Sequence, residues 1–178
     1  MRDVPDAVVA LLGQRPTATM AELADAAGVS RATLHRRFPS RESLLARIAE
    51  DAAAAAEHAV AQARPQEGPA PEACVRLVAA LVPLGGRFAF LLREGAWLDD
   101  LPGVAARIET LAEATAAVIR RGRHAGQFRL DLPASFQTRL VLAAVYTAWE
   151  AVQAGELGAK EAPEAAALAL LAGIEART

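Results

Sequence analysis

The chain has 178 residues, enough for one core-forming unit or for a small domain joined to a medium one. Hydrophobic residues make up 53% and aromatic residues only 4%, and alanine is the dominant type. This composition favours helices, and no sustained alternation of β-branched residues predicts strands. The formal net charge of −2 excludes an overall basic chain, so contact with nucleic acid would need a local basic cluster. We expect an all-α protein.

The sequence also predicts the cellular compartment of the protein. Cys74 is the lone cysteine, which excludes an internal disulfide and suits a reducing compartment. The first residues lack the basic-then-apolar layout of a signal peptide, and the longest apolar run, 165–174, is too short to cross a bilayer. We therefore expect a cytoplasmic protein without membrane contact. Alanine excess and nearly exclusive use of arginine as the basic residue suggest a bacterial source.

Three short helices are predicted at the N-terminus. The first covers residues 5–12, with Gly13 just past its end. The second covers 20–27 and follows Thr19, a residue that favours the capping position. Gly28 is expected to form the turn to the third helix because a Cβ atom there would clash.

The third helix should start after Ser30, a second capping residue, and end at Phe38, because a residue before proline disfavours helix. Ser40 should then cap a long fourth helix that runs to residue 63, before the Pro/Gly-rich loop 65–71. The remaining predicted helices cover residues 72–82, 86–94, 104–121, 133–154 and 163–177.

The third predicted helix has an arginine-rich outer face. At 100° per residue, Leu34 and Phe38 point inward, Arg36 points directly away, and two further arginines lie on the boundary. Residues 30–47 hold five arginines against one glutamate. Arginine can bind guanine edges and phosphates in the major groove of DNA. The alternative is an ordinary solvated helix face.

The segment AELADAAGVSRATLHRRFPSRESLL resembles the DNA-binding signature of the tetracycline-repressor (TetR) family of transcriptional regulators. The similar features are the AGVS turn, the TLHRRF recognition helix and the SRESLL start of the fourth helix, and the resemblance covers residues 4–50. It implies an N-terminal three-helix helix-turn-helix DNA-binding domain in residues 1–50. A helical bundle in residues 51–178 would bind an effector and dimerise, which gives about nine helices in total.

The resemblance also implies which side chains approach double-stranded DNA. His35 stands where the family usually has tyrosine, and the arm before the first helix is short, so contacts made by these parts in relatives could differ here. The implied DNA-binding residues are Thr19, Ser30, Arg31, Thr33, His35, Arg36, Arg37 and Arg41.

Seven of the eight aromatic residues lie beyond the loop 65–71. Aromatic side chains gathered among helices can line a pocket for an apolar or aromatic ligand, although each of them could equally be ordinary core. Because the TetR resemblance implies an effector-controlled repressor, we predict a pocket, and its aromatic side chains favour a small apolar or aromatic effector. Its predicted lining is Phe88, Leu92, Arg93, Trp97, Ile108, Leu111, Tyr146 and Trp149.

The last two predicted helices carry unusually apolar runs. Residues 140–152 are apolar almost all round apart from Thr147 and Glu150, and residues 165–174 are equally apolar. Such helices must be buried on more than one side. We predict that they form a two-fold four-helix interface of a homodimer, which would also supply the second recognition helix that DNA binding requires. A monomer with wholly internal helices is the alternative.

No catalytic set is apparent in the sequence. His58 and His124 lack the carboxylate or cysteine neighbours of a triad or metal site, and no glycine-rich phosphate loop occurs. We expect no enzyme activity, cofactor or metal. Together with the expected helical bundle, the TetR resemblance instead implies a repressor that a small apolar ligand releases from a palindromic operator. The alternatives are a dimeric DNA-binding protein without effector, and a ligand-carrier or interaction protein with a vestigial helix-turn-helix.

Overall fold

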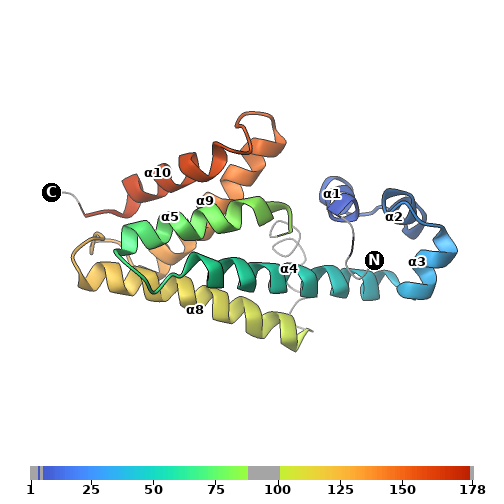
Figure 1. Cartoon of the computed structure of the whole chain (residues 1–178), viewed down its shortest axis with the longest axis horizontal. Coiled ribbons are helices and arrows are strands. Elements are labelled where there is room, and N and C mark those ends of the chain that lie inside the picture. Colours follow the sequence, from blue (N-terminus) through green and yellow to red (C-terminus); the bar gives the residue numbers. More distant parts are fainter. Residues whose placement is uncertain (1–3, 5, 88–100, 177–178) are drawn as a thin grey trace. The chain divides into compact units, whose positions relative to one another are not determined.

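The computed structural model describes residue 4, residues 6–87 and residues 101–176 (Figure 1). These described residues form eight α-helices and one short 3₁₀ helix, and their single β-bridge joins Phe128 to Glu175. The all-α prediction is therefore confirmed. The predicted helix 86–94 lies largely outside the described residues.

The described residues fall into two compact units. One contains the residues up to Ala54 together with those between Gly86 and Ala105, and the other contains Ala55–Gly85 together with the residues from Ala106 onward. The first unit holds helices α1 (Asp6–Gln14), α2 (Met20–Ala26) and α3 (Arg31–Arg37). Helix α4 (Arg41–Ala63) starts in the first unit and ends in the second.

The first unit begins as the sequence predicts, with one difference at α1. That helix continues to Gln14, so Gly13 lies inside its last turn rather than beyond its end. Helix α2 packs against both α1 and α3. Their shared core consists of small and aliphatic side chains and one aromatic ring, each with at most 7% exposure: Val8, Val9, Leu12, Ala18, Leu23, Ala24, Leu34 and Phe38.

Gly28 makes the turn between α2 and α3, but for a different reason from the one predicted. Its φ angle is +67°, and a Cβ atom built on it would meet nothing within 4 Å. The position therefore needs glycine because of its left-handed backbone, which a side chain disfavours, and not because space is short.

The second unit is a helical bundle. Helix α5 (Ala70–Leu81) leads into the 3₁₀ helix η1 (Val82–Leu84), and the later part of the chain supplies α8 (Pro102–His124), α9 (Ala134–Gln153) and α10 (Ala162–Ile174). Helix α10 packs against α9 and α5, and α9 also packs against α5 and η1.

A tightly packed turn joins α8 to α9. A Cβ atom on Gly122 would lie 2.3 Å from the ring of Phe128, which is 1% exposed, so only glycine lets this ring reach the helix. Arg123 donates hydrogen bonds to the carbonyl oxygens of Arg129 and Leu132 and to Oε1 of the fully buried Gln137. Arg123, in the last turn of α8, therefore supplies hydrogen-bond donors to the backbone carbonyls of the segment that joins α8 to α9.

The same turn also ends α10 earlier than predicted. Arg129 N–H donates to the carbonyl of Ile174, and Ala176 N–H donates to the carbonyl of Gln127. These two bonds hold Glu175 in extended backbone, with φ −65° and ψ 148°. Helix α10 therefore stops at Ile174 rather than at residue 177.

The helical periodicity of the sequence predicts that α8 buries one stripe of side chains: Val104, Ile108, Leu111, Ala112, Thr115, Val118 and Ile119. Val104, Val118 and Ile119 are buried, and Thr115 satisfies its buried hydroxyl by donating to the carbonyl of Leu111. Ala112, which the periodicity placed on the same stripe, is exposed instead. No helix among the described residues has the length and apolarity needed to cross a membrane.

Candidate nucleic-acid interface

Helix α3 begins at a side-chain cap. The Oγ atom of Ser30 accepts a hydrogen bond from the N–H of Thr33 at 3.1 Å, with Ser30 in extended backbone. Phe38 ends the helix, also in extended backbone, and its N–H donates to the carbonyl of Leu34. The predicted start and end of this helix are thus confirmed, and the cap fixes which side chains face outward.

The outer face of α3 is basic and accessible. Leu34 and Phe38 are 5% and 7% exposed, so they anchor the helix to the core of the first unit. The guanidinium of Arg37 lies 5.2 Å from the centre of the Phe38 ring, close enough for a cation–π contact. Thr33 is half-buried, and the exposed polar residues of the helix are Arg31, His35, Arg36 and Arg37.

Thr19 and Glu22 form a capping box at the start of α2. Thr19 Oγ1 accepts from the N–H of Glu22 at 3.3 Å, and Thr19 N–H donates to Glu22 Oε2 at 2.7 Å. Arg15 adds an ion pair to the same carboxylate at 2.8 Å. Hydrogen bonds from Thr19, and then the charge of Arg15, lower the pKa of Glu22 below its ordinary value of 4.5. The box fixes the start of α2, the helix that packs against α3.

Arg41 lies apart from the other arginines of the predicted DNA-binding set. It is half-buried at the first residue of α4, and its guanidinium donates to the backbone carbonyls of Ala18 and Pro16. These carbonyls belong to the connector between α1 and α2, residues 15–19. Sequence patterns could not indicate this contact, because it joins residues more than twenty positions apart through backbone atoms.

Half of the predicted ligand set falls outside the described residues: Phe88, Leu92, Arg93 and Trp97. The other half is half-buried, with Ile108 and Leu111 on α8 and Tyr146 and Trp149 on α9.

The two aromatic residues of this set are neighbours on α9. The rings of Tyr146 and Trp149 lie 5.8 Å apart and are tilted by 45°. A Cβ atom on Gly85 would come within 2.3 Å of Trp149, so the missing side chain at Gly85 makes room for the indole.

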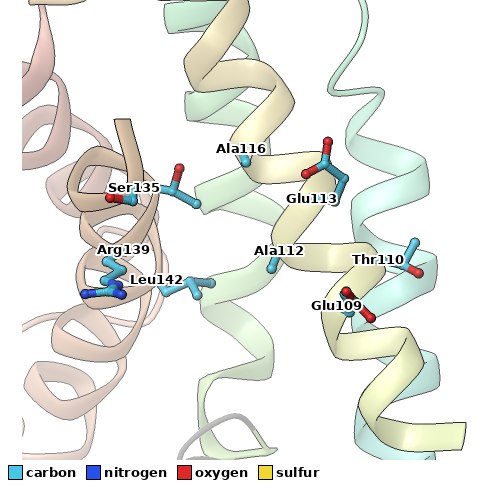
Figure 2. A pocket seen from close by; sticks show the side chains of 9 residues that line it. Glu109, Thr110, Ala112, Glu113, Ala116, Ser135, Arg139 and Leu142 are labelled. Carbon is cyan, nitrogen blue, oxygen red and sulfur yellow. The ribbon is translucent and has the colours of Figure 1, made fainter. Parts of the chain in front are cut away.

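A groove of about 690 Å³ runs between α8 and α9. Leu142 points from α9 toward Ala112 of α8, and Glu113 and Arg139 lie on the two opposite helices (Figure 2). Glu113 is paired with Arg120, whose hydrogen bonds, and then whose charge, lower the pKa of that carboxyl. The four described residues of the predicted ligand set do not line this groove.

A second groove, of about 410 Å³, lies between α9 and α10 and is almost entirely apolar. Its walls are mainly alanine and leucine, with Gly173 near the end of α10 and Thr147 as a polar member. Beside it, Leu168 on α10 is 64% exposed and Phe136 on α9 is 47% exposed. The outer face of the last two helices is therefore apolar and, in a single chain, uncovered.

The cysteine and the possible metal ligands among the described residues were the other candidates for a reactive site. Cys74 is 1% exposed, and burial raises the pKa of its thiol to about 12, so it serves packing rather than reactivity. Within residues 6–87 and 101–176, no three histidine, cysteine or acidic side chains are grouped as metal ligands would be.

Comparison with known proteins identifies the family. Residues 6–48 match the model of the "Bacterial regulatory proteins, tetR family". The HTH-type transcriptional repressor LfrR of Mycolicibacterium smegmatis is 32% identical over 154 residues, which cover 86% of this chain and 79% of LfrR. The HTH-type transcriptional regulator NfxB of Pseudomonas aeruginosa is 35% identical over 152 residues, 84% of this chain and 80% of NfxB.

The similarity extends to the fold. The crystal structure of LfrR from Mycobacterium smegmatis in complex with proflavine superimposes with a TM-score of 0.76 at 30% identity, covering 95% of this chain and 92% of that one. The chain belongs to the TetR family. It is a DNA-binding transcriptional regulator and not an enzyme, as the sequence predicted.

Proposed function

We propose that this regulator is a homodimeric repressor that binds a palindromic operator and leaves it when a small apolar or aromatic ligand binds. The observation that carries the proposal is the outer face of α3, where arginines and His35 are exposed while Leu34 and Phe38 hold the helix on its core. A short, capped helix with such a face suits insertion into the major groove.

The side chains of this face would have distinct tasks. Arg31 and Arg36 are exposed and long enough to fork onto guanine O6 and N7. Arg37 and Thr19 would bind phosphates, and His35 would donate to a base edge or a phosphate. Ser30 and Thr33, whose hydroxyls lie 2.9 Å apart, would offer an O–H to the backbone of DNA.

Dimerisation would use the outer face of α9 and α10. The groove between these helices, together with Leu168 and Phe136, presents apolar surface whose exposure to water is unfavourable. A second copy related by a two-fold axis would cover it and form a four-helix interface. The dimer would place two recognition helices one DNA turn apart or a multiple of that distance.

The effector would bind in the second unit. Tyr146 and Trp149 offer neighbouring aromatic faces, and the relative LfrR has been crystallised in complex with proflavine. Because α4 is continuous from the first unit to the second, a ligand that shifts α4 would change the spacing of the two recognition helices. Operator affinity would fall through a shift in population between two dimer geometries.

Selection of genomic fragments by the purified protein tests this function. The bound fragments should share a sequence with two inverted half-sites, and a panel of apolar and aromatic compounds should contain one that releases them. Recovery of fragments without a common sequence would contradict the repressor proposal. A shared operator that no compound releases would favour a dimeric DNA-binding protein without an effector.

A further inference from the structure

We propose that Arg41 is a positioning residue that links α4 to the connector before α2, and that it does not serve as a phosphate contact. The proposal rests on the function proposed above only for its DNA-binding readout. Its basis is the forked contact of one guanidinium with two backbone carbonyls, those of Pro16 and Ala18.

The acceptor at Ala18 needs a donor. Ala18 is 3% exposed, and its carbonyl lies just before the N-cap residue Thr19, so it precedes the first carbonyl used by the helix. The N–H of Glu22, which would reach Ala18 in a longer helix, donates to the Thr19 hydroxyl instead. The guanidinium of Arg41 supplies the missing donor, since Nη1 of Arg41 lies 2.5 Å from that carbonyl oxygen.

Arginine is the suitable residue for this link. Its planar guanidinium can donate to two acceptors at once from separate nitrogens, as Nη1 and Nη2 do here toward Ala18 and Pro16. A lysine ammonium at the same place could act on a phosphate as a point charge, but it lacks this rigid fork. Arg41→Lys should therefore disrupt the contact with the connector carbonyls, whereas it would preserve a phosphate contact.

The link has a consequence for regulation. Arg41 is the first residue of α4. The connector to which it donates its hydrogen bonds leads directly into the capping box of α2. Helix α2 packs on α3. A movement of α4 would thus reach the recognition helix through Arg41 and the connector as well as through the short turn at Phe38.

The test compares Arg41→Lys and Arg41→Gln with wild type and with Arg37→Gln. Binding of each full-length protein to a duplex recovered by genomic selection, or to a random-sequence duplex, is measured over a series of salt concentrations. Hydrogen exchange of the free proteins is followed at the amides of residues 15–23, with residues 141–150 of α9 as the internal control. Circular dichroism confirms that each variant is helical.

The positioning role predicts that both Arg41 variants bind DNA roughly tenfold more weakly, because neither side chain can hold both connector carbonyls and α2, on which α3 packs, is then less well positioned. The slope of log affinity against log salt should equal that of wild type, whereas Arg37→Gln, at the proposed phosphate contact, should reduce it by about 0.9. Exchange at residues 15–23 should become faster in both Arg41 variants. A phosphate contact predicts the opposite pattern: Arg41→Lys would bind DNA like wild type, and the salt slope of Arg41→Gln would be smaller in magnitude by about 0.9. That pattern, with unchanged hydrogen exchange at residues 15–23, would overturn the proposal. Hydrogen exchange is measured on the free proteins. It therefore tests the contact between Arg41 and the connector even if the protein shows no sequence-specific DNA binding.

Discussion

Ser30 and Thr33 are joined by two hydrogen bonds at the start of α3, one from the Thr33 N–H to the Ser30 Oγ at 3.1 Å and one between the hydroxyls at 2.9 Å. The cap fixes the first turn of the helix that carries the basic face. We predict that Ser30→Ala lowers the free energy of unfolding by about 1 kcal/mol, while Ser30→Asp, which can also cap, lowers it less. Urea unfolding measures both. Equal stability of the two variants would show that the cap contributes nothing.

The basic face of α3 gives the second prediction. Arg31→Ala and Arg36→Ala should each weaken operator binding by about 1–3 kcal/mol, because each removes a forked donor to a base. Fluorescence anisotropy with a selected duplex measures the loss. The matched control is Arg139→Ala, an exposed arginine on α9, which should bind like wild type. If all three variants lose the same affinity, overall charge rather than the α3 face governs binding.

Two glycines should respond differently to alanine. At Gly28 the backbone is left-handed but space is open, so Gly28→Ala should cost only about 1–2 kcal/mol of conformational strain. At Gly122 the added Cβ would overlap the ring of the buried Phe128, and overpacking should cost about 1–3 kcal/mol or more. Combining Gly122→Ala with Phe128→Leu should recover part of the loss. A Gly122→Ala protein as stable as wild type would mean that Phe128 can move aside.

The capping box predicts a dependence of stability on acid. The pKa of Glu22 is lowered in the folded chain, so its contribution is fully present above the ordinary value of 4.5 and is lost as pH falls through the lowered value. Glu22→Gln should therefore destabilise the protein at neutral pH and should flatten the fall in melting temperature below pH 4.5. Glu42 and Glu113 also have lowered pKa values, so the comparison is of the variant with wild type at each pH. Parallel melting curves would contradict the prediction.

The dimer face can be tested at one exposed residue. Leu168, on α10, is 64% exposed in the single chain, and Leu168→Glu should convert the dimer to monomer because a charge would be buried in an apolar interface. Light scattering coupled to gel filtration gives the mass. Val75→Glu, at another exposed apolar residue on α5, is the control and should leave the mass of the dimer unchanged. If Leu168→Glu has the wild-type mass, the interface lies elsewhere.

Local signals explain why much of the first unit could be predicted. Thr19, Ser30 and the Phe38–Pro39 pair each act within a few residues, and the structure confirms the ends that they predict for α2 and α3. Contacts between distant segments were not predictable in this way. The guanidinium of Arg41 reaches the connector, and Phe128 reaches Gly122 and the end of α10, through geometry that only the folded chain defines. Ala112 is likewise exposed although the periodicity of α8 predicts that it is buried, because the elements that pack against a helix decide which of its apolar residues are covered.

The central claim is that two copies of the α3 face read one DNA site. Nuclease footprinting of the purified protein on a selected genomic fragment tests it most directly. We expect two protected half-sites, one helical turn apart or a multiple of it, and loss of both footprints together in Arg36→Ala. Unbroken protection that does not depend on sequence, or an unchanged pair of footprints in Arg36→Ala, would contradict it.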